Sequence, residues 1–193
     1  MSAKDIDPQL QKLDDELAGW KEPAQHLARG ARIPRYAINL SSSTLDDRAF
    51  PKAVAAELIA SGVPGTSLLF EISEDDAMSR LESVLRFSTS IRSLGCGIMV
   101  SGFGRRSATF MLLKTLRPDF VKVDGVIVRK LLSAPAAEAK LKAILRVGEV
   151  MGFQTIGEMV EEQDILVRLK ALGVGYAQGF GIQPPHPIEK LAS

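Results

Sequence analysis

Short apolar runs that end in a polar residue or a glycine recur along this chain, and most are followed by a segment with helical periodicity. Near-continuous apolar runs are typical of parallel strands whose two faces are both covered. Repeated βα units with short connections place the helices outside a parallel sheet. The predicted strands are Tyr36–Leu40, Leu68–Ile72, Ile98–Val100, Phe120–Val123, Thr155–Glu158 and Tyr176–Phe180.

These six strands are two fewer than a closed (β/α) barrel requires. The sequence therefore predicts an α/β fold, an incomplete barrel with about six parallel strands and outer helices. Ser41–Asp47 is predicted as a loop that caps the next helix. The predicted helices are Arg48–Ala60, a segment with Met78, Leu81, Leu85 and Ile91 that ends at Gly95, Ala108–Leu116, a stretch broken near Ala134–Pro135 that ends at Gly152, and Glu161–Leu172.

An amphipathic helix is predicted within residues 1–30, ahead of a barrel domain at residues 31–193. Asp7 followed by Pro8 is typical of a helix start, and an apolar stripe follows at Leu10, Leu13, Leu17 and Trp20. The strands around Ile38 and Ala177 would border an open seam, because nothing pairs with their outer edges. Three occupants of the seam are compatible with the sequence: the N-terminal helix, a second copy of the chain, or a partner protein.

Composition excludes several classes of function. The net charge is +1 and the basic residues are scattered, so no nucleic-acid duplex is expected as a partner. No apolar run approaches the roughly 20 residues that span a bilayer, so no membrane association is expected. Cys96 is the single cysteine, and His26 and His186 lack metal-ligand spacing. These features indicate a cytoplasmic protein without a disulfide or a histidine metal site.

Polar residues stand where the predicted strands end. Lys122 lies between two valines and therefore points to the opposite face of its strand from them. The segment Gly102–Arg106 resembles a phosphate-binding loop, but it lacks the spacing of a P-loop, so a turn with solvated arginines is the favoured interpretation.

Five motifs in order resemble the site motifs of the EAL-domain family, which comprises cyclic di-GMP phosphodiesterases and their inactive relatives on a (β/α)8 barrel. The similarity runs from about Tyr36 to Pro187. The motifs are Asn39-Leu40-Ser41, Glu71-Ile72-Ser73-Glu74, Lys122-Val123-Asp124, Glu158-Met159-Val160-Glu161 and Gln178-Gly179-Phe180.

The resemblance implies a role for each matching residue. Asn39 and Glu71 resemble ligands of a first divalent cation, and Asp124 lies next to the position of a second. Lys122 resembles the lysine beside the attacking water, and Glu158 resembles the general base. The remaining matches are Glu161, a supporting carboxylate, Gln178, a polar contact near the ligand, and Glu74, which steadies a neighbouring loop.

Two departures separate this chain from an active member of the family. No Glu-Ala-Leu motif precedes Tyr36, and the family's aspartate pair aligns with Ser101 and Gly102. Asn39 and Glu71 alone would bind a hard divalent cation poorly. The remnants Glu158 and Lys122 are then not expected to catalyse hydrolysis, and Lys122 is predicted to serve as a structural counter-ion to Glu71 or Glu158.

Helix capping is an equally good interpretation of Glu74 and Glu161, whereas a site remnant is favoured for Glu71 and Glu158. The favoured function is a catalytically inactive regulatory domain in bacterial cyclic di-GMP signalling, which binds a protein partner or a second copy through the open seam and needs no cofactor. A receptor that binds cyclic di-GMP without hydrolysis is the first alternative. An active phosphodiesterase that uses Mg²⁺ or Mn²⁺ is the second.

Overall fold

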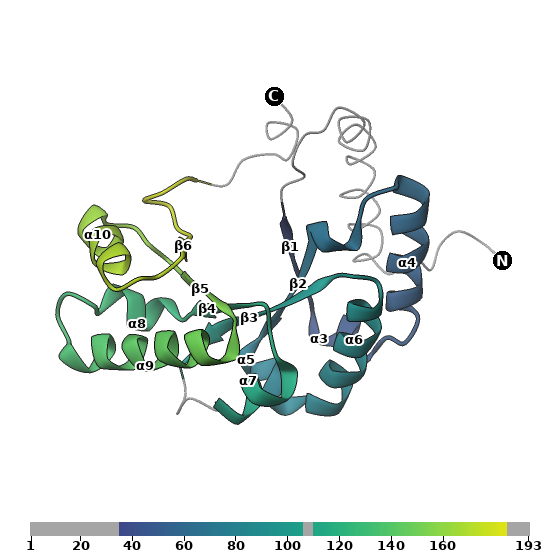
Figure 1. Ribbon diagram of the computed structural model, residues 1–193, viewed down its shortest axis with the longest axis horizontal. Coiled ribbons are helices and arrows are strands. Elements are labelled where there is room, and N and C mark those ends of the chain that lie inside the picture. Colours follow the sequence, from purple (N-terminus) through teal and green to yellow (C-terminus); the bar gives the residue numbers. More distant parts are fainter. Residues whose placement is uncertain (1–34, 106–109, 185–193) are drawn as a thin grey trace.

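The computed structural model describes residues 35–105 and 110–184 (Figure 1). The predicted N-terminal amphipathic helix, Arg106, His26 and His186 lie outside the described residues. Within the described part of the chain, no helix is long and apolar enough to cross a membrane.

Six parallel strands form one sheet in which every strand pairs with its neighbours in the sequence. The sheet is curled into a half-barrel, as the sequence predicts, and helices lie around its outer side (Figure 1). The edge strands are the first and the last of the six. The strands are β1 (Tyr36–Asn39), β2 (Leu68–Ser73), β3 (Gly97–Phe103), β4 (Phe120–Val123), β5 (Gln154–Gly157) and β6 (Tyr176–Ala177).

Helices follow the strands closely. Side chains at the strand ends cap several of them: Ser41 accepts the N–H of Thr44, Ser73 that of Asp76, and Asp124 that of Val126. The helices are α3 (Ser42–Asp46), α4 (Phe50–Ser61), the 3₁₀ turn η1 (Gly65–Ser67), α5 (Glu74–Ser79), α6 (Leu81–Ser93), α7 (Phe110–Leu116), α8 (Gly125–Arg129), α9 (Pro135–Met151) and α10 (Gln163–Ala171).

Four predicted elements differ from the structure by more than two residues or in kind, and the other boundaries differ by at most two. The predicted loop Ser41–Asp47 contains helix α3, because Ser41 caps it. The predicted single helix around Met78 to Ile91 is divided into α5 and α6 at Arg80, whose backbone (φ −130°, ψ 37°) is not helical. Strand β3 does not end at Val100. It continues through Ser101, which pairs with Ser73, and past an irregularity to Phe103, which pairs with Val123.

The fourth is strand β6, which ends at Ala177 rather than at Phe180. Beyond it the backbone packs closely on the segment after β5. A Cβ on Gly179 would lie 2.2 Å from the carbonyl oxygen of Val160, and one on Gly181 would lie 2.3 Å from that of Glu161. Only glycine permits this backbone-to-backbone contact, which takes the chain out of the sheet.

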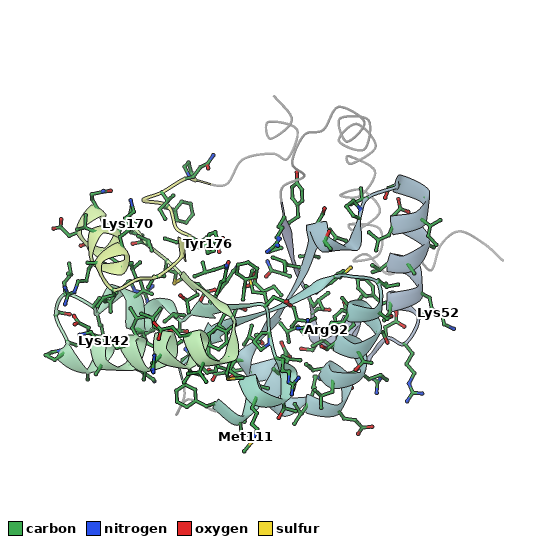
Figure 2. The ribbon with its side chains drawn as sticks, viewed as in Figure 1. Lys52, Arg92, Met111, Lys142, Lys170 and Tyr176 are labelled. Atoms are coloured by element: carbon green, nitrogen blue, oxygen red, sulfur yellow. The ribbon has the colours of Figure 1, made fainter. Side chains whose placement is uncertain are left out.

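The main core lies between the convex face of the sheet and the helices. Three rings pack there: Phe70 from β2 makes edge contacts with Phe50 of α4 and Phe87 of α6, at centroid distances of 6.1 and 5.6 Å. Charged side chains such as Lys52 and Lys142 lie on the outer surfaces of their helices (Figure 2). The concave face is therefore the side of the sheet that is left to form a site.

Candidate functional site

Alternate residues of the strands point into the concave side of the half-barrel and form two layers. The lower layer is apolar and holds Ala37, Leu69, Met99, Phe120, Ile156 and Tyr176. The upper layer, at the carboxyl ends of the strands, is polar and includes Asn39, Glu71, Lys122 and Gln178. Both layers line one open groove of about 1090 Å³.

A buried ion pair lies at the centre of the upper layer. Lys122 on β4 donates from Nζ to Oε2 of Glu71 on β2, and both side chains are less than a tenth exposed. In the amide orientation that satisfies its hydrogen bonds, Asn39 on β1 donates from its side-chain nitrogen to Oε1 of the same carboxylate at 3.0 Å. The structure thus brings together the two residues that resemble ligands of the first cation. The Lys122 ammonium offsets the negative charge of the Glu71 carboxylate.

Glu158 follows β5 and is the fourth group of this cluster. Burial raises the pKa of its carboxyl group above the usual Glu value, and the negative charges of Glu71 and Asp124 act in the same direction. The ammonium of Lys122 and a hydrogen bond from the backbone N–H of Gly102 act against them. Glu158 therefore holds a proton more tightly than an exposed carboxylate does.

Asp124 is buried and has a structural role at its strand end. It accepts the N–H of Val126 at 2.7 Å and so caps α8. Its other oxygen, Oδ2, lies 3.8 Å from Nε of Arg105, the first residue after the turn that follows β3. Arg105 therefore lies at the edge of the polar layer. Of the rest of the predicted Gly102–Arg106 loop, Gly102 and Phe103 belong to β3, Gly104 forms the turn, and Arg106 lies outside the described residues.

Glu74 is nearly fully buried at the start of α5. Its Oε2 accepts the N–H of Gly104 at 3.2 Å, at the turn after β3. This hydrogen bond joins α5 to the turn that follows β3, beside the polar layer.

Two of the predicted residues lie apart from the buried cluster. Glu161 is exposed and does not line the groove. Gln178 lines the groove from its rim with an exposed side chain, and its backbone N–H donates to the carbonyl of Gly157 at 2.9 Å.

Gly102 and Met159 are two members of the site whose roles the sequence did not predict. Gly102 contributes a backbone N–H to Glu158 and has a φ of 65°, and Met159 has a φ of 55° directly after Glu158. A non-glycine residue rarely adopts this conformation. The sequence placed Gly102 in a glycine-containing loop and at the position of the family's aspartate pair, and Met159 inside a site motif, but neither observation predicted these backbone roles.

Two of the carboxylates at the strand ends are held by other groups of the protein, Glu71 by Lys122 and Asp124 by the start of α8. Among the described residues, no group of three or more Asp, Glu, His or Cys side chains is arranged to hold a metal ion. At the end of β3, Ser101 and Gly102 supply a hydroxyl and a backbone group rather than carboxylates. Hard cations such as Mg²⁺ require several oxygen ligands. The Glu71 carboxylate, which resembles such a ligand, is paired with Lys122.

The fold and site define an α/β half-barrel protein with a polar cluster at the carboxyl ends of its strands. The EAL domain family model matches residues 10–185, so the chain belongs to the EAL domain family. The match begins within the segment that the sequence assigned to a separate N-terminal helix, and extends through all six strands.

Several similar proteins are named for cyclic di-GMP. The chain is 33% identical over 151 residues to cyclic di-GMP phosphodiesterase PdeB of Shewanella oneidensis, covering 78% of this chain and 18% of PdeB. It is 29% identical over 151 residues to cyclic di-GMP phosphodiesterase RocR of Pseudomonas aeruginosa, covering 78% of this chain and 38% of RocR. The chain thus spans well under half the length of these curated relatives.

Solved structures show the same fold. The EAL domain of FimX from Pseudomonas aeruginosa, solved with bound c-di-GMP, superposes with a TM-score of 0.79 at 29% identity, covering 91% of this chain and 70% of that one. The EAL domain of DcpA from Mycobacterium smegmatis has a TM-score of 0.79 at 26% identity, covering 91% of this chain and 79% of that one.

Proposed function

We propose that this EAL domain is a regulatory domain of cyclic di-GMP signalling that does not hydrolyse the dinucleotide and acts through contact with another protein. The observation that carries the proposal is the buried pair of Lys122 and Glu71. An ammonium holds the carboxylate that would otherwise be offered to a cation.

The chemistry of phosphodiester hydrolysis supports this proposal. Divalent cations activate the attacking water and offset the charge that develops on the phosphate. In support of the proposal, no group of three or more acidic, histidine or cysteine side chains among the described residues is arranged to hold such an ion, and the single charge of Lys122 is already offset by Glu71. Without such cations, Glu158 can still accept a proton, but it does not supply a metal-activated hydroxide or offset the negative charge that develops on the phosphate.

Binding of intact cyclic di-GMP is a second candidate function, favoured by the groove. It is about 1090 Å³ in volume, opens at the polar layer and exposes Asn39 and Gln178, whose amides suit hydrogen bonds to bases or phosphates. The FimX domain, similar in sequence and fold, was solved with this dinucleotide.

Isothermal titration of cyclic di-GMP, with and without Mg²⁺ or Mn²⁺, followed by chromatography of the recovered nucleotide, tests both functions. Intact nucleotide under all conditions is expected. Metal-dependent hydrolysis would overturn the proposal of inactivity. Heat of binding with intact nucleotide supports the receptor function, and a Gln178→Ala variant should then bind more weakly. If cyclic di-GMP produces no heat of binding, contact with another protein remains the proposed function.

A further inference from the structure

Met159 places an exposed thioether beside the polar layer. Its side chain is 54% exposed, whereas Met99, in the lower layer of the groove, is 3% exposed. Arg129 donates from Nη1 to Sδ of Met159 at 2.9 Å. Within residues 35–105 and 110–184, this is the one methionine sulfur that accepts a hydrogen bond. An exposed methionine can be oxidised to a sulfoxide, a change that a reductase can reverse.

The backbone conformation of Met159 depends on the position of its side chain. Its φ is 55°, and a residue other than glycine keeps such a conformation only where its surroundings hold it there. The N–H groups of the residues on both sides of it donate to β4 and to the segment after β6. The side chain itself rests on Gly125, so closely that a Cβ there would lie 2.5 Å from Sδ. The contact with Gly125 therefore helps to hold the left-handed backbone.

Oxidation of the sulfur would disturb this contact. A lone pair of Sδ attacks one oxygen of hydrogen peroxide, the S–O bond forms as the O–O bond breaks, and the second oxygen leaves as water with both protons. Sulfur loses the two electrons that the peroxide gains. The new oxygen has no room on the side of Gly125, whereas the Arg129 guanidinium offers it a donor. A sulfoxide is polar and a thioether is only a weak acceptor, so the oxidised side chain is drawn away from Gly125.

We propose that Met159 is a peroxide-sensitive modification site whose conversion to the sulfoxide loosens residues 158–160 and the start of α8. The change reaches the polar layer because Glu158, the preceding residue, is a member of its buried cluster. A thiol-dependent methionine sulfoxide reductase would reverse the change: two thiols are oxidised to a disulfide, and the oxygen leaves as water. This inference is independent of the proposed function, because it concerns the framework of the site and not its ligand or partner.

Treatment of the full chain with hydrogen peroxide, with sulfoxides located by peptide mass spectrometry, tests the proposal. Oxidation of the wild type should lower its melting temperature by at least about 2 °C, and reductase with a dithiol should restore it. Met159→Leu lacks the sulfur and should keep its melting temperature on treatment. Met111→Leu is the matched control. Met111 is 68% exposed on the outer side of α7 (Figure 2), so this variant should respond as the wild type does.

Hydrogen–deuterium exchange locates the effect in the fold. In the oxidised wild type, exchange should become faster in residues 158–160 and 125–129 and stay unchanged in α4, which lies elsewhere in the fold. Three results would each overturn the proposal. The first is a Met159 that stays reduced while Met111 is oxidised. The second is a sulfoxide at Met159 with an unchanged melting temperature, and the third is an equal loss in wild type and Met159→Leu.

Discussion

The side chain of Met159 packs directly on Gly125, and any residue other than glycine at position 125 would collide with it. A Cβ on Gly125 would lie 2.5 Å from Sδ of Met159 and 2.9 Å from its Cβ. Arg129, one turn along α8, donates from Nη1 to the same sulfur at 2.9 Å. This contact holds Met159 at a φ of 55° beside Glu158 and so joins the strand end of β5 to the start of α8.

Gly125→Ala should destabilise the fold by roughly 1–3 kcal/mol, because the added methyl group overpacks the contact with Met159. In a Met159→Gly background, the same change should cost clearly less, since the colliding side chain is absent and glycine adopts the left-handed backbone freely. Urea unfolding of the wild type, the two single variants and the double variant measures the coupling. Equal costs in the two backgrounds would contradict the interpretation.

Lys122→Met and Glu71→Gln should each destabilise the protein by about 3–5 kcal/mol, because each leaves a buried partner uncompensated. The double variant should lose less than the sum. Lys142→Met is the matched control. Lys142 pairs with Glu138 at 2.8 Å but is 59% exposed, so its loss should cost at most about 1 kcal/mol. A wild-type melting temperature for Lys122→Met would contradict the role of Lys122 as a structural counter-ion.

Glu158 should make stability depend on pH. Its folded pKa lies above the unfolded value near 4.5, so the folded state binds the proton more tightly. Stability should therefore fall as pH rises from about 4.5 through the folded pKa and then level off. Glu158→Gln should remove this decrease. The measurement is the free energy of unfolding in urea over a pH series, taken as the difference between wild type and variant. A difference that does not vary with pH would contradict the raised pKa of Glu158.

Ser101→Asp with Gly102→Asp should create affinity for Mn²⁺ that the wild type lacks. A Cβ on Gly102 meets only Asp124 Oδ2, at 3.8 Å, and aspartate tolerates a positive φ better than most residues. The new carboxylates would lie at the end of β3, beside Glu158 and Asp124. Calorimetry with Mn²⁺ measures the gain, and Ser101→Asn with Gly102→Asn controls for size. Equal binding by wild type would show that the existing ligands suffice.

The sequence determined the order of the strands and the chemistry of the concave face. Apolar runs bounded by glycines and caps are local signals, so the bounds of β4 were predicted correctly. Because side chains alternate between the two faces of a strand, Lys122 faces away from Val121 and Val123. Boundaries were less predictable where they depended on packing. The early end of β6 follows from the close approach of Gly179 to Val160, which is distant in sequence.

Only the tertiary structure decided which polar groups meet. Lys122 and Glu71 are 51 residues apart, and sequence left both Glu71 and Glu158 open as partners of Lys122. The curl and register of the sheet bring the Lys122 ammonium onto Glu71 and the Gly102 N–H onto Glu158. Periodicity specifies the face on which a side chain lies, but contact across strands depends on the shear and curvature of the sheet, which arise when all the strands pack together.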